Sequence, residues 1–176
     1  WVVYARSQGA SKRAQLNSNI TWGTSTGSFN STDPSSTLIT LGSSSGTNAS
    51  SGNYVCYAWH NVEGYQRFGT YIGNNTDNDG PFVYTGFRPR MLAIKGATES
   101  YPWCVFDSAR NTHNLVDKHI AWNYADAEAT EPTGARKVDF LSNGFKVMAD
   151  AASINGDADT YVYMAWGDVP FKYNNT

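Results

Sequence analysis

Short apolar runs separated by turn-forming residues recur along the chain and constrain its fold more than any other feature. Each run is rich in aromatic or β-branched side chains and is bounded by Gly, Asn, Asp, Ser or Pro, which is typical of β-strands joined by turns. The expected strands are Trp1–Tyr4, Thr37–Leu41, Tyr54–Trp59, Phe82–Tyr84, Met91–Ile94, Trp103–Phe106, Gly144–Met148 and Tyr161–Trp166. Ala109–His119 suggests a helical turn. The sequence predicts an all-β protein, an antiparallel β-sandwich of jelly-roll-like form.

Charge is almost absent from a long part of the first half. Between Ala14 and Val62 the only residue charged at neutral pH is Asp33, and residues 17–53 contain 11 Ser, 7 Thr and 5 Asn. Such side chains compete with helical hydrogen bonding, so this stretch is expected to form long loops or strands with a hydroxyl-rich face. The whole chain has 13 Lys+Arg and 15 Asp+Glu. Without a basic cluster, a nucleic-acid partner is not expected, and no apolar stretch predicts membrane insertion.

Two colinear matches indicate an internal duplication. Tyr54-Val55-x-x-Ala58-Trp59-x-x-Val62 recurs as Tyr161-Val162-x-x-Ala165-Trp166-x-x-Val169, and Trp1-x-Val3-Tyr4 recurs as Trp103-x-Val105-Phe106. The second copy has a lead-in with two expected strands that the first copy lacks. The expected organisation is therefore an incomplete first β repeat over 1–65, a linker over 66–80 and a complete second β repeat over 81–176.

The missing lead-in has a structural consequence. A sandwich without two of its strands would expose a sheet edge and part of its core. Two explanations stay open. In one, a longer polypeptide precedes Trp1; in the other, a neighbouring subunit supplies the missing strands by β-augmentation.

Four segments carry a resemblance to a known family. They are Gly80–Pro89 (GPFVYTGFRP), Trp103–Asp107 (WCVFD), Asp139–Phe145 (DFLSNGF) and Tyr161–Phe171 (YVYMAWGDVPF). Together they resemble a domain of unknown function that recurs in virion proteins of tailed bacteriophages, notably marine and cyanobacterial phages. The resemblance covers essentially the whole chain, with Val62–Tyr65 through Phe68-Gly69 similar to a linker between repeats.

The resemblance implies a virion structural protein, often one near the C-terminal end of a long tail protein. It brings no established catalytic residues. It also implies assembly in the host cytoplasm, followed by an extracellular location as part of the particle. Because the cytoplasm is reducing, Cys56 and Cys104 are expected as buried thiols in apolar strands rather than as a disulfide.

Two patterns raise the question of an enzyme. Gly23-Thr24-Ser25-Thr26-Gly27 matches the nucleophile elbow G-x-S-x-G, but that motif requires a following helix, and no helical pattern follows here. Glu63, Glu99, Glu128 and Glu131 are candidates for a glycosidase carboxylate pair, although no motif surrounds them. We expect no catalytic residues and no enzyme activity.

Two sets of residues are candidates for binding. Asn75, Asp77 and Asp79 have the spacing of the first half of a calcium loop, but Gly86 stands where the twelfth-position Glu would be needed, so turn chemistry is favoured over Ca²⁺ and no cofactor is expected. Trp22, Trp122 and Tyr124 fall outside the expected strands, whereas Trp1, Trp59, Trp103 and Trp166 are expected in the core. Exposed rings beside polar groups suit carbohydrate contact, although covering a loop or a subunit contact explains them equally well.

These features lead to one main functional hypothesis. We expect a non-enzymatic virion protein, a tail-fibre or appendage module that recognises host-surface glycans. Its expected partners are copies of itself, in a homo-oligomer, and other virion proteins. The alternative is a capsid decoration protein or an extracellular filament subunit that assembles by strand complementation.

Overall fold

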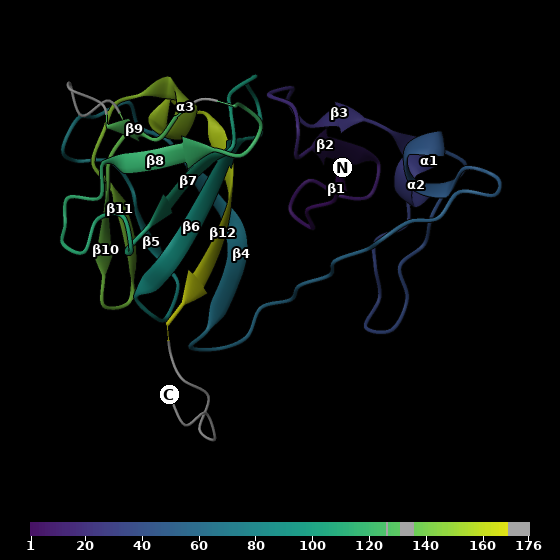
Figure 1. The fold of residues 1–176 in the computed structure, drawn as a ribbon, viewed down its shortest axis with the longest axis horizontal. Coiled ribbons are helices and arrows are strands. Elements are labelled where there is room, and N and C mark those ends of the chain that lie inside the picture. The colour runs from purple at the N-terminus through teal and green to yellow at the C-terminus, as the bar shows by residue number, and fades with distance from the viewer. Residues whose placement is uncertain (126, 131–135, 169–176) are drawn as a thin grey trace.

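The computed structural model contains a β-sandwich joined to a smaller N-terminal sheet (Figure 1). It describes residues 1–125, 127–130 and 136–168. The N-terminal sheet has the order β1-β2-β3, and two short helices follow it. These elements are β1 (Val2–Val3), β2 (Lys12–Gln15), β3 (Gly23–Thr24), α1 (Thr26–Phe29) and α2 (Ser45–Asn48).

The sandwich consists of a six-stranded and a three-stranded antiparallel sheet. The larger sheet has the order β4-β12-β6-β7-β8-β9, and the smaller has the order β10-β11-β5. The elements are β4 (Gln66–Ile72), β5 (Phe82–Tyr84), β6 (Pro89–Gly96), β7 (Cys104–Asp107), β8 (Lys118–Ala121), β9 (Ala129–Thr130), β10 (Val138–Leu141), β11 (Gly144–Val147), α3 (Ala152–Asn155) and β12 (Thr160–Gly167). The prediction of an all-β, sandwich-like protein is confirmed.

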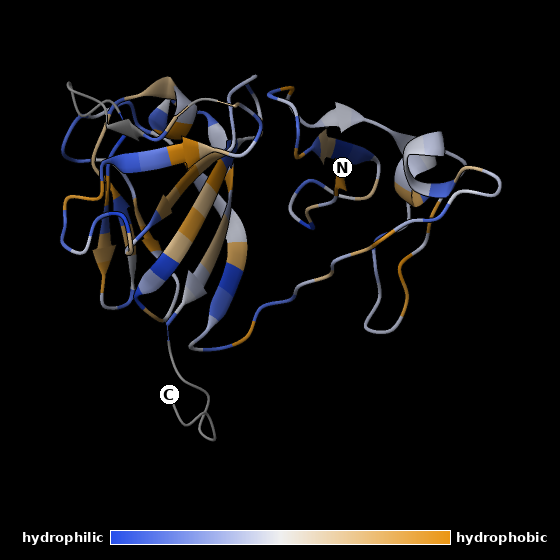
Figure 2. Cartoon of the chain, viewed as in Figure 1, coloured by the Kyte–Doolittle hydropathy of each residue, from blue (hydrophilic) through white to orange (hydrophobic). Residues whose placement is uncertain are grey.

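The main core lies between these two sheets. Leu92, Ile94 and Phe106 of the six-stranded sheet are fully buried, as is Phe145 of the smaller sheet. The ring of Phe145 meets the ring of Tyr163 edge-on, with centroids 5.3 Å apart. Alternation along the strands directs these residues to one face, and Figure 2 shows the resulting hydrophobic bands on the central strands.

A second, smaller core joins the N-terminal sheet to the opposite face of the six-stranded sheet. Trp22 and Trp103 lie in it with Ala14 and Val162. The indole N–H of Trp103 also donates to the backbone carbonyl of Gln15, at 3.0 Å. Because this core is assembled from both parts of the chain, it fixes the N-terminal sheet against the sandwich.

The second half of the chain matches the predicted strands closely. The runs at 82–84, 91–94, 103–106, 144–148 and 161–166 coincide with β5, β6, β7, β11 and β12. The segment 109–119, expected to contain a helical turn or a short helix, forms no helix; a turn over 108–110, in which the Asn111 N–H donates to the Asp107 carbonyl, is followed by a bridge at Val116 and by β8. The range 66–80, expected as a linker, begins with β4, which forms a seven-residue ladder with β12.

The first half differs more from its prediction. Trp1–Tyr4 contains β1, but the runs at 37–41 and 54–59 form no strand. Residues 17–53 form mainly loops, in which the hydroxyl of Ser44 caps α2 by accepting from the Gly46 N–H. The structure does not show the expected duplication, since β12 is a central strand whereas its sequence match at 54–59 is unpaired.

Several residues expected in the core are exposed. Trp1 and Trp59 retain more than half of their accessible surface, and only Trp103 of the four expected core tryptophans is fully buried. Cys56 is also exposed, because its segment is not a strand; Cys104 is buried as expected, and no disulfide joins the two. Trp59 and Cys56 are exposed for one reason: residues 54–59 have no strand neighbour within the described part of the chain. No helix among the described residues is long and apolar enough to cross a membrane.

Candidate functional site

A tight turn at the start of β4 forms one wall of a surface pocket. Val62 and Gln66 form an isolated antiparallel bridge and exchange two backbone hydrogen bonds of 3.0 Å. Gly64 closes the turn with a φ of 74°, a conformation that residues with a Cβ rarely adopt. The turn therefore fixes Glu63, within it, and Arg67, just after it, on the same side of the sandwich.

The turn between β5 and β6 forms the opposite wall. Gly86 has a φ of 87°, and the backbone N–H groups of Thr85 and Gly86 both donate to the carbonyl of Asn143, at 3.0 and 3.1 Å. The Thr85 hydroxyl donates to the Phe87 carbonyl, at 2.6 Å. These bonds hold the end of β5, so that the Tyr84 ring stands at the rim with 59% of its surface exposed.

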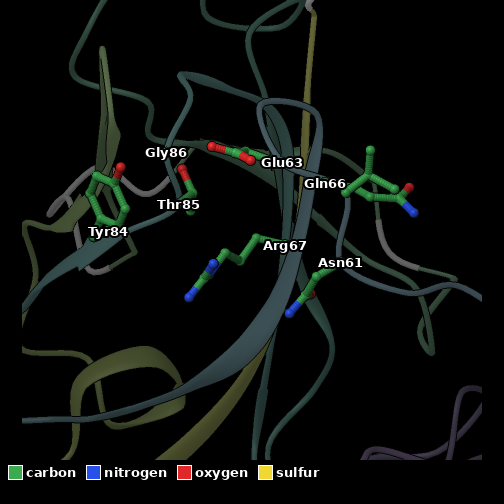
Figure 3. A pocket seen from close by; sticks show the side chains of 8 residues that line it. Asn61, Glu63, Gln66, Arg67, Tyr84, Thr85 and Gly86 are labelled. Carbon is green, nitrogen blue, oxygen red and sulfur yellow. The ribbon is translucent and has the colours of Figure 1, made fainter.

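The two turns enclose a pocket of about 370 Å³. In Figure 3 the guanidinium of Arg67 extends into the space between Tyr84 and Asn61, and Glu63 reaches toward Thr85. The lining residues are Asn61, Val62, Glu63, Gln66, Arg67, Tyr84, Thr85 and Gly86. This volume is at the lower end of the range of small-molecule sites.

The two charges in the pocket are not neutralised by neighbours. No salt bridge in the described part of the chain includes Glu63 or Arg67. Burial raises the pKa of the nearby Tyr163 hydroxyl, and Arg67 lowers it to a smaller extent. The pocket thus offers a guanidinium donor, a carboxylate acceptor, amide groups and an exposed ring, which together suit a hydroxylated ligand.

The three predicted binding aromatics lie in different surroundings. Trp22 is buried at 5% exposure, which contradicts the expectation of an exposed ring, because it packs edge-on against Trp103 with centroids 6.4 Å apart. Trp122 lies against the same Trp103 at 6.4 Å but remains 36% exposed, and Tyr124 is 44% exposed. The structure therefore leaves Trp122 and Tyr124 available on the loop after β8, separate from the pocket.

In the turn with calcium-like spacing, two aspartates form ion pairs with lysines. Asp77 forms an ion pair with Lys137 at 3.0 Å, and Asp79 forms one with Lys146 at 2.7 Å. The hydrogen bond from Lys146 lowers the pKa of the Asp79 carboxyl. Asn75 has a φ of 51°, as turns require. Among the described residues no group of three His, Cys, Asp or Glu is arranged to hold a metal ion, and the geometry agrees with turn chemistry.

The residues of the two enzyme-like patterns lie in different surroundings. Contrary to expectation a helix does follow Ser25, but it is the four-residue α1, and the Ser25 hydroxyl bonds to that of Ser28 at 2.8 Å. Of the candidate carboxylates, Glu63 lines the pocket and Glu128 pairs with Arg110 at 2.9 Å. Glu131 lies outside the described residues.

Sequence reasoning missed most of the pocket. Its residues come from segments interpreted as a linker and a strand, which belong to the six-stranded and the three-stranded sheet and meet where these two sheets pack. Two local signals were present: the Glu63-Gly64-Tyr65 turn between apolar residues and the Thr85-Gly86 turn after β5. Each predicts a turn, but neither indicates that the two turns face each other.

The fold and the pocket define a sandwich-like, all-β protein with a polar surface site. Its sequence matches the family described as domain of unknown function DUF7483 over residues 1–170. Because the match spans nearly the whole chain, the protein belongs to this family. No match was found among curated proteins or among solved structures.

Proposed function

We propose that this chain is a non-enzymatic virion protein of a tailed bacteriophage, a tail-fibre or appendage module that binds glycans of the host surface. The virion assignment rests on the resemblance of its strand segments to phage structural proteins. The glycan assignment rests mainly on one observation: in the pocket, Glu63 and Arg67 form no salt bridge with another described residue and lie beside the exposed Tyr84 ring.

The chemistry of the pocket matches that of a sugar. A pyranose ring presents an apolar face of C–H groups and a rim of hydroxyls. Tyr84 supplies a ring for stacking, the side-chain NH2 of Asn61 supplies a donor beside its oxygen, which accepts from the Phe68 N–H, and Glu63 and Arg67 bind hydroxyls or an acidic substituent. Trp122 and Tyr124 are exposed as well, but they lie outside this pocket, on the loop after β8.

An array of immobilised neutral and acidic oligosaccharides, probed with the intact chain, tests this function. We expect retention on a subset of the sugars, and Tyr84→Ala should weaken it by about tenfold, as for loss of one stacking contact. Trp122→Ala and Tyr124→Ala are matched controls, since they remove exposed rings outside the pocket. If these two variants lose binding instead, the glycan site lies on the loop after β8.

Two further results would overturn parts of the proposal. If the folded chain binds no sugar on the array, host-glycan recognition is wrong. Release of reducing sugar from a bound polysaccharide would show that the protein is a depolymerase, with Glu63 as the first carboxylate to substitute. Mass spectrometry of purified virions tests the location, because the peptides of this chain should be present in stoichiometric amounts.

A further inference from the structure

An extended, uncharged segment joins the N-terminal part of the chain to β4. Val55, Tyr57 and Trp59 are each more than half exposed. No backbone N–H or carbonyl of residues 55–59 takes part in a hydrogen bond found among the described residues. Residues of this kind favour strands, so Tyr54–Trp59 has the composition of a strand and lacks a partner.

The edge of the six-stranded sheet that β4 forms is also open. β4 is the outermost strand and pairs only with β12. The N–H of Phe68 points away from β12, since it donates to the Asn61 side chain at 2.8 Å. By the two-residue alternation of an antiparallel ladder, the N–H groups of Thr70 and Ile72 point the same way, and neither has a hydrogen-bond partner among the described residues. Ile72 is 64% exposed.

Aromatic contacts hold the segment away from the β4 edge of its own chain. Tyr57 lies 6.1 Å from the ring of Trp1 and stacks on Trp59 at 6.0 Å. Trp59 in turn meets Trp166 of β12 edge-on at 6.4 Å. The segment is therefore tied toward the N-terminal strand and the outer face of the sheet.

The segment also resembles the strand that β4 already accepts. Tyr54-Val55-x-x-Ala58-Trp59 repeats the pattern of Tyr161-Val162-x-x-Ala165-Trp166 in β12, and every residue of β4 pairs with β12. Neither 54–59 nor 68–72 contains a charged residue. A strand of this sequence can thus lie along β4 without burying an unpaired charge.

We propose that Tyr54–Trp59 pairs as a β-strand with the free edge of β4, residues 69–72, in a second copy of this chain. It specifies the homo-oligomer that the sequence led us to expect for a virion protein, and in this respect it rests on the proposed function. A second copy is the partner because one chain carries both the unpaired strand and the open edge. Two copies related by a twofold axis then exchange strands reciprocally, and each closes the edge of the other.

Hydrogen exchange of the full chain at micromolar and at millimolar concentration tests the pairing, with the molar mass measured by light scattering in the same samples. We expect alternate amides of 55–59, and those of Thr70 and Ile72, to exchange about tenfold more slowly at the higher concentration, together with a shift from monomer to dimer. Protection that does not change with concentration would mean that the segment closes on its own β4, and would overturn the proposal. Absence of protection at both concentrations would also overturn it.

Tyr57→Pro and Ala58→Pro each remove one strand N–H in an exposed segment. Because neighbouring N–H groups of a strand point to opposite sides, one of these two variants should abolish both the dimer and the protection of Thr70 and Ile72. Ser36→Pro is the matched control, because Ser36 is exposed, lies in another loop and makes no backbone N–H hydrogen bond among the described residues. Unchanged near-UV circular dichroism verifies that each variant is folded. Dimerisation of both proline variants of 57–58 at the wild-type concentration would contradict the proposal. Sugar binding by the monomer on the array is independent of either result, so the two proposals fail separately.

Discussion

The ammonium group of Lys95 lies on the face of β6 opposite the main core, between β6 and the N-terminal part of the chain. The side chain is fully buried, and its Nζ donates to the backbone carbonyls of Asn19 and Gly96, at 3.1 and 3.3 Å. None of the salt bridges among the described residues includes it. Burial lowers the pKa of Lys95 to about 8, against 10.5 for an ordinary lysine. The group therefore costs stability whenever it is charged in the folded state.

Lys95→Met should stabilise the protein at neutral pH by about 1–3 kcal/mol, the upper value being the pKa difference expressed as free energy. Below pH 8 both folded and unfolded wild type are protonated at Lys95, so the full cost is present. Between pH 8 and 10.5 the unfolded state binds more protons, and wild-type stability rises toward that of the variant. Urea unfolding at pH 7 and above pH 10.5 measures both differences. If the free energies of unfolding of variant and wild type differ by the same amount at the two pH values, packing and not charge is responsible for the stabilisation.

At the scale of elements, the contact between β5 and β11 holds the Tyr84 wall of the pocket. Gly144 pairs with Tyr84 across these strands, and a Cβ at 144 would collide with the backbone carbonyl oxygen of Val83. Gly144→Ala should therefore destabilise the fold by about 1–3 kcal/mol, as overpacking does. It should also weaken sugar binding, because Tyr84 and Thr85 would shift with the strand. Urea unfolding and the oligosaccharide array measure the two effects.

Gly23→Ala is the control for this substitution. Gly23 is exposed, and a Cβ there would have no neighbour within 4 Å. The stability of the Gly23→Ala variant should therefore stay within about 0.5 kcal/mol of wild type. If Gly144→Ala unfolds at the same urea concentration as this control and binds sugar normally, the close approach of β5 and β11 does not position the pocket.

The elements also show how far the sequence predicts this structure. Strands such as β6, β7 and β12 were predictable because tertiary packing agrees with their local apolar pattern. β4 and β10 were missed: Gln66–Ile72 contains Gln, Arg, Gly and Thr, and its strand state depends on pairing with β12. Tyr54–Trp59 shows the opposite case, a strong local pattern without a partner. The pocket was not predictable, since two separate turns form it.

At the scale of the whole molecule, one small core connects the N-terminal sheet to the sandwich. Trp22 is its largest contribution from the N-terminal side, and Trp103 is its fully buried counterpart in the sandwich. Within residues 1–61 the other large buried hydrophobic side chain is Phe29. The position of the N-terminal sheet therefore depends on the Trp22 contact more than on any other single side chain of that sheet.

Trp22→Ala should accordingly separate the unfolding of the two parts. Removing a buried tryptophan costs about 3–5 kcal/mol of stability. We expect this cost to weaken the packing of the N-terminal sheet on the sandwich. Urea unfolding should then become biphasic, and proteases should cut first within 1–61. Trp122→Ala is the matched control, because it removes an exposed indole that also contacts Trp103. The unfolding of this variant should stay cooperative, with a loss of stability below about 1 kcal/mol. A single, equally shifted transition for both variants would mean that the two parts fold as one unit irrespective of this core. Pulse proteolysis with peptide identification distinguishes these outcomes, because it reports which part of the chain opens first.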